Sequence, residues 1–323
     1  MQTAEIARVV SFLILTIVVY VHAVAVCLRM LLKRQKGGAL RQWTDRVTLV
    51  LAFAGTGCIL YARYIEPYRL SITPVRIQSA KIPPGSRPIR VVHLSDIHSD
   101  ATPRLEAMLP AAVSQQKPDF IVMSGDYFNS MKGLAVFRTC LAELTKVAPT
   151  YVVKGNWETD HWREVSPFDG IEVHELNGKA VRVEFSGVPI WVTGLAAHNE
   201  DMLAQSLSDV PRDEFRIFVY HYPDYIYEAA KQGIDLYVAG HTHGGQVALP
   251  FYGALVTLSK FGKRFEAGKF RVNDTWLYVN RGLGVDGGFL PKVRFWAPPE
   301  MTVIDIEPID QNDRPESSRL LTN

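Results

Sequence analysis

The chain has 323 residues, of which 47% are hydrophobic, and this is enough for one sizeable core with additional elements. Its formal net charge is +2, from 35 basic and 33 acidic residues, so the charge balance indicates no general surface for nucleic acid. The 3 cysteines, Cys27, Cys58 and Cys140, show no C-x-x-C spacing. This excludes neither face of a membrane but argues against a disulfide framework and a thiolate metal site.

Two apolar runs stand near the start of the chain. The first goes from Ile6 to Leu32, and its centre, Val9 to Leu28, has about the length needed to span a bilayer. A signal peptide is the alternative, but no small-x-small cleavage pattern follows and the basic residues come after the run. The second run, Val47 to Ala62, is shorter and contains two glycines. We interpret it as a second transmembrane helix, with an interfacial or re-entrant segment as the alternative.

Basic residues on both sides of the second run give conflicting answers for orientation. The loop between the runs carries Lys33, Arg34, Lys36, Arg41 and Arg46. The positive-inside rule places this loop in the cytoplasm, and the rest of the chain outside if both runs span. Four further basic residues follow the second run: Arg63, Arg69, Arg76 and Lys81. We therefore expect location in the cell (inner) membrane, and the face of the C-terminal domain stays open.

Composition divides the chain into four parts. Residues 1–64 form the membrane anchor, of one or two transmembrane helices. Residues 65–88 are rich in proline and basic residues and read as a linker, which adds an edge strand through Leu70 to Ile77. Residues 89–307 form the main domain. Residues 308–323 are polar, and we expect a disordered tail.

Strands and helices alternate through the main domain. Strands are predicted at Ile89–Leu94, Phe120–Met123, Thr150–Val153, Phe215–Tyr220, Leu236–Ala239, Trp276–Val279 and Met301–Ile306, with a hairpin of Lys179–Phe185 and Pro189–Thr193. Helices are predicted to begin at Thr102–Pro103, to include Val136–Leu144, and to cover Asp224–Gln232. This alternation indicates a layered α/β fold, and the later strand-rich part indicates a second sheet.

Polar side chains follow five of these strands at the points where the strands end. They are Asp96, His98, Asp126, Asn156, His221, His241 and His243. Ligands of open α/β sheets bind beyond the carboxyl ends of the strands, so we expect one convergent site. Gly125, Gly155 and Gly240 each precede one of these residues, as expected where a strand turns sharply to aim a side chain.

The set of side chains indicates metal binding. Oxygen and imidazole ligands without thiolate suit Mn²⁺ best, with Fe or Zn²⁺ as alternatives to it. Seven ligands exceed the needs of one tetrahedral ion, so we expect two divalent ions that share the carboxylate of Asp126. Two ions about 3.5–4 Å apart can hold a bridging hydroxide and both ends of an in-line displacement at phosphorus. Each motif alone is common in turns, but their combination and order predict a functional centre.

These motifs resemble those of the calcineurin-like metallophosphoesterase family. The matching segments are Ser95-Asp-Ile-His98, Ser124-Gly-Asp126, Gly155-Asn156, His221-Tyr-Pro-Asp224 and Gly240-His-Thr-His-Gly-Gly-Gln246. Tyr64-Ile-Glu-Pro67 and Arg281-Gly-Leu-Gly284 look like the membrane-associated phosphodiesterase branch. The resemblance implies a four-layer α-β-β-α sandwich of two mixed sheets. It also implies one metal held by Asp96, His98, Asp126 and His243, and another held by Asp126, Asn156, His221 and His241.

One position departs from the family pattern. The family usually has Gly-Asn-His-Asp/Glu where this chain has Gly155-Asn-Trp-Glu158. The usual imidazole touches the scissile phosphate and helps the leaving group, whereas the indole of Trp157 donates a hydrogen bond but cannot shuttle a proton at neutral pH. His161 is an alternative donor, although we favour a solvated histidine there. Arg281 is a candidate for bidentate phosphate binding, with a surface salt bridge as the alternative.

The resemblance implies a hydrolase that cleaves a phosphodiester or pyrophosphate bond. The loss of the histidine favours a good leaving group, so we expect an amphipathic, lipid-linked substrate at the bilayer, such as UDP-2,3-diacylglucosamine or a phospholipid. The alternatives are a phosphomonoesterase or phosphoprotein phosphatase, and a non-enzymatic metal-binding membrane scaffold. No nucleic-acid partner is expected, and the oligomeric state is not predicted. The aromatic residues Tyr127, Phe128, Trp157 and Trp162 either line an acyl-chain groove or belong to the core.

Overall fold

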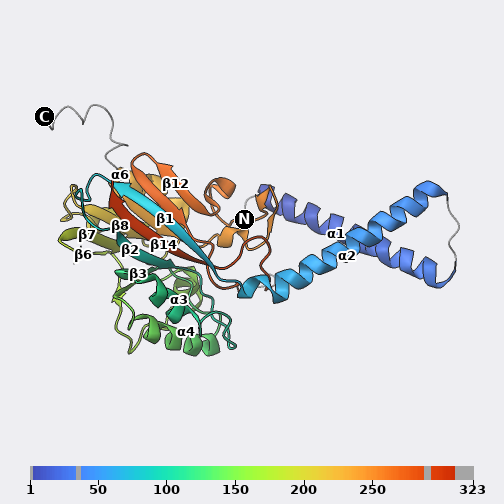
Figure 1. Ribbon diagram of the computed structural model, residues 1–323, viewed down its shortest axis with the longest axis horizontal. Helices are drawn as coiled ribbons and strands as arrows, with labels where there is room; N and C mark the ends of the chain where they lie inside the picture. The colour runs from blue at the N-terminus through green and yellow to red at the C-terminus, as the bar shows by residue number, and fades with distance from the viewer. Residues whose placement is uncertain (1–2, 34–37, 287–291, 310–323) are drawn as a thin grey trace.

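A hairpin of two long helices projects from one end of a layered α/β domain (Figure 1). The computed structural model describes residues 3–33, 38–286 and 292–309. Helix α1 is Thr3–Leu31 and α2 is Ala39–Tyr64. Both are long and apolar enough to cross a membrane, and most of their large apolar side chains are exposed. Both predicted apolar runs are therefore helical, and the end of α1 and the start of α2 lie at the end of the hairpin farthest from the domain (Figure 1).

Polar contacts join the two helices of the hairpin. The hydroxyl of Tyr20 on α1 donates to the carbonyl of Ala52 on α2 at 3.2 Å. Near the far end of the hairpin, Arg29 donates to Asp45 at 2.7 Å. The close approach at Tyr20 needs a small neighbour, because a Cβ on Gly55 would lie 3.0 Å from the tyrosine hydroxyl. This is the small-residue packing that brings helices together in lipid.

The first sheet has six strands in the order β1-β14-β2-β3-β4-β5. Their bounds are Ser71–Ser79, Glu300–Pro308, Ile89–Leu94, Phe120–Met123, Thr150–Val152 and His174–Glu175. The pair β14–β2 is antiparallel, and the other pairs are parallel. The edge strand expected between residues 65 and 88 is β1. It lies at the edge of the sheet and pairs with β14.

The second sheet also has six strands, in the order β12-β13-β9-β8-β7-β6. Their bounds are Gly268–Val272, Thr275–Val279, Leu236–Ala239, Phe215–Val219, Val188–Gly194 and Lys179–Phe185. The outer pairs at both edges are antiparallel hairpins, and the central strands are parallel. The predicted hairpin is β6–β7. The alternating pattern did not reveal β12, because its side chains are exposed or half-buried along the whole strand.

Three apolar cores separate the four layers. One core lies between the two sheets and includes Val91, Val122, Ile190 and Ile217. A second lies between the first sheet and the helices α3, Leu109–Gln116, and α4, Met131–Leu144. The third covers the second sheet with α5, Leu203–Ser206, and α6, Ile226–Lys231. The predicted α-β-β-α sandwich of two mixed sheets is confirmed.

Shorter elements complete the domain. They are η1 Glu66–Tyr68, a π-helical turn η2 Trp157–His161, η3 Glu200–Met202, η4 Pro223–Tyr225, η5 His243–Gly245, β10 Ala248–Leu249, β11 Gly253–Ala254 and η6 Gly262–Phe265. Residues 310–323 of the expected tail lie outside the described residues, as do Arg34 and Lys36 of the basic loop.

The helix predicted to begin at Thr102–Pro103 begins later, and that prediction was wrong. The carboxylate of Glu106 accepts hydrogen bonds from the backbone N–H groups of Arg104 and Leu105, at 2.6 and 3.0 Å. These bonds hold the segment as turns, and α3 starts at Leu109 with its own proline, Pro110, in the first turn.

Both ends of the hairpin are fixed to the domain. At the start of α1, the buried carboxylate of Glu5 accepts hydrogen bonds from the backbone and hydroxyl of Thr257. At the end of α2, the carbonyl of Ala62 accepts from the backbone N–H of Arg294 at 2.9 Å. Just beyond it, the buried Glu66 accepts from the backbone N–H of Ala297 at 2.7 Å. The hairpin is therefore held at two points, and its orientation relative to the domain is set by them.

Candidate metal centre

The seven predicted ligands lie beyond the carboxyl ends of five central strands. Asp96 and His98 follow β2, Asp126 follows β3, and Asn156 follows β4 in the first sheet. His221 follows β8, and His241 and His243 follow β9 in the second sheet. Because the two sheets pack face to face, these loops meet at one end of the sandwich. This agrees with the expected location of the site.

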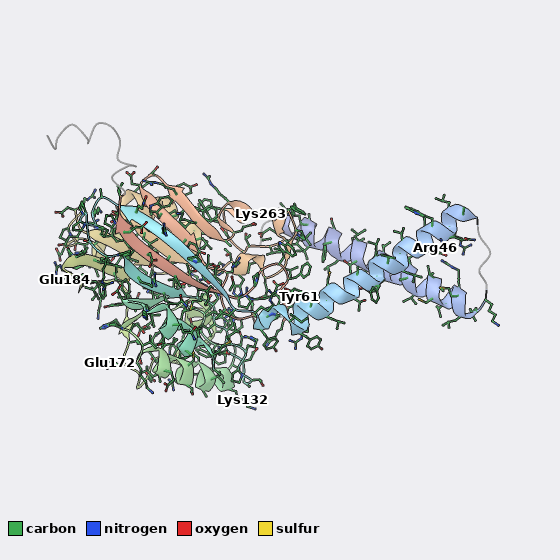
Figure 2. All side chains as sticks on the ribbon, in the orientation of Figure 1. Arg46, Tyr61, Lys132, Glu172, Glu184 and Lys263 are labelled. Atoms are coloured by element: carbon green, nitrogen blue, oxygen red, sulfur yellow. The ribbon has the colours of Figure 1, made fainter. Side chains whose placement is uncertain are left out.

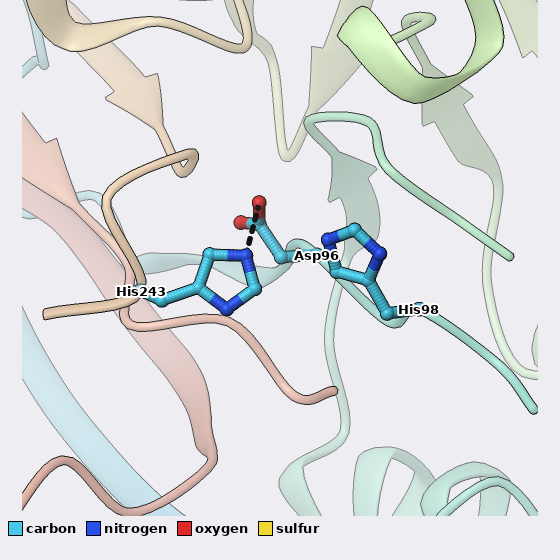
Figure 3. A group of neighbouring side chains, drawn as sticks. All are labelled: Asp96, His98 and His243. Atoms are coloured by element: carbon cyan, nitrogen blue, oxygen red, sulfur yellow. Dashed lines mark ion pairs between the residues drawn. The ribbon is translucent and has the colours of Figure 1, made fainter. Parts of the chain in front are cut away.

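Five of the seven residues form two groups of neighbouring ligand atoms. Atoms of Asp96, His98 and His243 lie within 4.8 Å of one another (Figure 3), as do atoms of Asp96, Asp126 and His221. The carboxylate of Asp96 belongs to both groups, although Asp126 was the expected shared ligand. His241 adjoins them, with Nδ1 3.2 Å from Nε2 of His221. The structure therefore places two carboxylates and four imidazoles in one cluster.

The shortest distances run between carboxylate oxygens and Nε2 atoms. His243 Nε2 is 3.3 Å from Asp96 Oδ1, and His221 Nε2 is 3.2 Å from Asp126 Oδ2. His98 Nε2 is 3.6 Å from the same oxygen of Asp126. The backbone N–H of His241 donates to both oxygens of Asp96, at 3.1 Å each. Asp126 thus faces imidazole nitrogens from both sheets, and Asp96 faces an imidazole and a backbone N–H from the second sheet.

Two of the imidazoles are oriented by acceptors on their other nitrogen. Nδ1 of His98 lies 2.8 Å from Oδ1 of Asn129, whose amide group is fixed because its Nδ2 donates to carbonyl and carboxylate oxygens. Nδ1 of His221 lies 2.9 Å from the carbonyl of Ser124. Both acceptors require the proton on Nδ1, so Nε2 is the nitrogen that each ring directs toward the carboxylates and toward a metal ion.

Among the described residues, two of the predicted ligands each carry a buried atom that has no hydrogen-bond partner. These atoms are Nε2 of His98 and Oδ1 of Asn156. Buried polar atoms without a partner are rare, because each forfeits the hydrogen bonds it would make in water. A cation bound by His98 and Asn156 would satisfy both atoms, so the chemistry of these residues fits a metal centre.

The backbone at the cluster is held in an uncommon conformation. Five of the seven residues have positive φ angles: Asp96 at 48°, His98 at 42°, Asp126 at 59°, His241 at 70° and His243 at 52°. Residues other than glycine rarely adopt this left-handed region, and each such position costs of order 1 kcal/mol. The surrounding fold stabilises this strained arrangement, as is typical of sites where side-chain direction matters.

Two glycines allow the carboxylates to sit where they do. A Cβ on Gly240 would lie 1.9 Å from the hydroxyl of Ser95 and 2.1 Å from Oδ2 of Asp96. A Cβ on Gly155 would lie 2.2 Å from Oδ1 of Asp126. The reason for glycine at these two positions is therefore close approach to a carboxylate, rather than the turn geometry that the sequence suggested.

Burial and the two carboxylates set the protonation of the site. Burial lowers the pKa of His98 and, together with the charge on His221, lowers that of His241 to about 3. Burial also opposes protonation of His221, but the carboxylate of Asp126 raises its pKa to about 9. Burial alone would raise the pKa of both aspartates, yet the imidazoles hold them below the usual range. Both carboxylates are therefore charged, and a divalent cation can replace the proton on His221.

Glu158 joins the loops after β3 and β4. Its buried carboxylate accepts from the backbone N–H groups of Asp126, Tyr127 and Gly155, at 2.9, 2.8 and 3.0 Å. Burial and the nearby charge of Asp126 raise the pKa of Glu158 to about 7. These bonds fix the positions of Asp126 and of the segment that carries Asn156.

Trp157 lies at the edge of the cluster. Its backbone N–H donates to Oδ1 of Asp126 at 2.9 Å. Its ring meets that of His98 edge-on, with centroids 5.2 Å apart, and stacks on the exposed His161 at 4.8 Å. Tyr127 and Phe128, by contrast, are fully buried in the core between the first sheet and the helices α3 and α4, so they do not line a groove.

Arg281 approaches the cluster from the end of β13. Its Nε is 3.2 Å from the buried carboxylate of Glu300, and its side chain is 27% exposed. A Cβ on Gly244, next to His243, would lie 3.0 Å from Cγ of Arg281. Arg281 is thus paired with a buried acid and also borders the loop that carries two predicted ligands.

Sequence reasoning missed Asn129 and Arg294. Asn129 stands three residues after Asp126, and nothing in its spacing reveals that it orients His98. Arg294 is fully buried, donates to the carbonyls of Gly284, Ala297 and Arg281, and lies 3.3 Å from Nδ1 of His243. An arginine is mostly exposed unless it is paired, so its burial could not be predicted from the sequence.

The fold and the cluster define a metal-dependent phosphoric ester hydrolase. The family model of the calcineurin-like phosphoesterases matches residues 89–245. The metallophosphoesterase YkuE of Bacillus subtilis, whose activity is uncharacterised, is 30% identical over 262 residues, covering 76% of this chain and 89% of YkuE. The chain belongs to the calcineurin-like phosphoesterase family, whose members use a dinuclear divalent metal centre.

Two further relatives bear on the membrane and the reaction. Phosphodiesterase YaeI of Escherichia coli is 27% identical over 264 residues, covering 76% of this chain and 92% of YaeI. A bovine transmembrane protein with a metallophosphoesterase domain is 28% identical over 244 residues, covering 67% of this chain and 53% of the bovine protein. The two apolar helices and such relatives together indicate membrane association.

Proposed function

We propose that this chain is a membrane-anchored hydrolase of a phosphodiester or pyrophosphate bond in a lipid-linked substrate. UDP-2,3-diacylglucosamine and phospholipids are the first candidates, and the cell (inner) membrane is the proposed location. Two divalent ions, with Mn²⁺ preferred, would be held by Asp96, His98, Asp126, Asn156, His221, His241 and His243. When bound, they supply an activated water and neutralise charge on the phosphoryl group.

The observation that carries this proposal is the short path from the metal centre to the anchor. Arg294 connects them: its backbone N–H donates to Ala62 at the end of α2, and its guanidinium lies 3.3 Å from His243. If α2 crosses the bilayer, the centre therefore lies near the membrane surface. The phosphate of a lipid headgroup also lies at the membrane surface, close to such a centre. A soluble substrate would not need the centre to be near the membrane.

Exposed aromatic side chains surround the base of the hairpin. Trp296, 61% exposed, neighbours Phe295, whose ring meets Tyr61 of α2. Phe251 and Tyr252 are exposed in the turn between β10 and β11, and Tyr252 borders a cleft against the first turns of α1. Figure 2 shows Tyr61 and Lys263 where the hairpin meets the domain. Tryptophan and tyrosine prefer the headgroup region of bilayers, so this surface supports the proposed bilayer contact.

The chain's own residues favour a substrate with a good leaving group. The indole of Trp157 occupies the edge of the cluster where a proton donor would stand, and it cannot transfer a proton at neutral pH. Asn156 and the partly exposed Arg281 are the groups available to hold phosphate oxygens beside the metals. Phosphoanhydrides and activated diesters need little protonation of the leaving group, whereas serine phosphates need more.

A substrate screen tests the proposal. The full chain, purified in detergent and supplied with Mn²⁺, is expected to release a nucleotide monophosphate or a headgroup from at least one lipid in a panel of phospholipids and UDP-linked acylated sugars. The Asp126→Ala variant serves as the control for contaminating activity. Turnover of soluble monoesters alone would refute the lipid-linked substrate and support a phosphomonoesterase.

A further inference from the structure

A cavity lies between the end of the hairpin and the segment that carries His98. Its volume is about 470 Å³. Arg63 of α2 and Tyr68 of η1 form one side, and Asp100, Arg104, Asn129 and Lys292 form the other. The cavity adjoins the metal centre without containing its ligands, since Asn129 faces Nδ1 of His98 and the lone pair of that ring is on the opposite nitrogen.

The cavity has an excess of positive charge. Its lining holds three cationic side chains and one carboxylate. Lys292 and Arg104 both bind this carboxylate, that of Asp100, at 2.7 and 2.6 Å. Arg63 forms no ion pair within the described part of the chain; its guanidinium lies 5.6 Å from the ring centre of Tyr64. The one acid is thus shared by two cations, and the third has no acidic partner there.

A buried donor in the lining also lacks an acceptor. The side chain of Arg104 is only 10% exposed. Its terminal nitrogens donate to Asp100 and to the carbonyl of His98, but Nε is buried and has no partner. Because Nε has no accessible surface, a bound anion would interact with Arg104 through the charge of its guanidinium, and this attraction adds to the excess of positive charge in the cavity.

The position of Arg63 identifies the source of such an anion. Arg63 stands in the last turn of α2, directly beyond the apolar stretch of the proposed transmembrane helix. Basic side chains at this depth meet the phosphate layer of the bilayer, where anionic headgroups are concentrated. We propose that the cavity binds the phosphate of an anionic lipid headgroup while the lipid stays in the bilayer. This proposal rests on the membrane anchoring proposed above, but not on the hydrolysis of any lipid.

Binding is best measured in a chain that cannot turn the lipid over. The full-length Asp126→Ala variant in detergent would be titrated with dihexanoyl phosphatidylglycerol, and in parallel with dihexanoyl phosphatidylcholine. We expect tighter binding of the anionic lipid by at least about tenfold. The added pair Arg63→Gln and Lys292→Gln is expected to remove this preference. Arg63→Lys with Lys292→Arg keeps both charges and is expected to keep the preference, which separates lost charge from misfolding.

Arg46→Gln is the matched control, because it removes the same charge from the far end of the same helix (Figure 2), and it should leave the preference intact. Equal binding of the two lipids, or an unchanged preference in the double glutamine variant, would overturn the proposal. Equally effective competition by soluble glycerol phosphate would also overturn it, since the ligand would then be a free phosphate. If the Asp126→Ala chain binds the anionic lipid but the wild type turns over no lipid, the proposed headgroup binding is supported and only the proposed hydrolysis is refuted.

Discussion

Gly240→Ala is expected to empty the metal centre without unfolding the domain. The added Cβ would stand 2.1 Å from Oδ2 of Asp96 and 1.9 Å from the hydroxyl of Ser95. Real contacts of this kind exceed about 3 Å, so either the carboxylate or the loop must move by about 1 Å. The carboxylate cannot swing away cheaply, because it is buried and both of its oxygens accept from the backbone N–H of His241.

We expect a loss of about 1–3 kcal/mol in the free energy of unfolding from this overpacking. A displacement of about 1 Å at a reacting centre costs on the order of 100-fold in rate. Bound Mn²⁺ per chain, measured by elemental analysis after gel filtration, should fall well below that of the wild type. Gly57→Ala is the matched control, since a Cβ there meets nothing within 4 Å. Full metal content and unchanged turnover in Gly240→Ala would refute the reasoning that close approach to Asp96 explains this glycine.

Three further predictions concern the candidate site and the two N-terminal helices. Trp157→His should raise kcat/KM for a phosphomonoester by about 100-fold, because an imidazole can protonate the leaving group; an unchanged rate would mean that another group limits the reaction. The affinity for Mn²⁺ should rise about 100-fold between pH 6 and pH 8. The reason is that His221, with its pKa raised to about 9, must release a proton to bind the ion. Calorimetry that shows the same affinity at both pH values would contradict this. Tags placed in the loop at residues 34–37 and at the C-terminus should lie on opposite faces of the membrane, and accessibility from the same face would show that only one helix crosses.

The secondary structure could be predicted from the sequence where the pattern of apolar residues fits only one kind of element. Ile89–Leu94 and Phe120–Met123 are strands with the predicted bounds, because short apolar runs bounded by polar residues have few alternatives. The start of α3 was misplaced, because Thr102–Pro103 has the local signature of a helix start while the side chain of Glu106 satisfies the same backbone N–H groups in a turn. Strand β12 escaped detection because it lies at a sheet edge and buries no side chain fully.

In the candidate site, too, some residues were predictable from the sequence and others were not. The predicted ligands follow strands, so their order along the chain was enough to predict that they lie at one end of the sheets. The residues that orient them were not predictable, because Asn129 and Arg294 act through contacts between segments that are distant in sequence. Asn129 faces His98 across 31 residues, and Arg294 reaches His243 across 51. The contact of Arg294 with the end of α2 was not predictable either, although it links the helical hairpin to the candidate metal centre.

The most direct test compares the wild-type chain with Asp126→Asn for Mn²⁺-dependent cleavage of a lipid phosphodiester or sugar-nucleotide lipid. This variant keeps the shape of the side chain but removes a charge that faces His98 and His221. Loss of a residue that only orients a metal ligand typically lowers activity by about 10- to 100-fold. Loss of a predicted ligand itself should cost more, so we expect turnover to fall by at least about 100-fold. Cleavage by the wild type that is lost in the variant is the predicted result. Equal turnover by the two proteins, or none by the wild type on any such lipid, would contradict it.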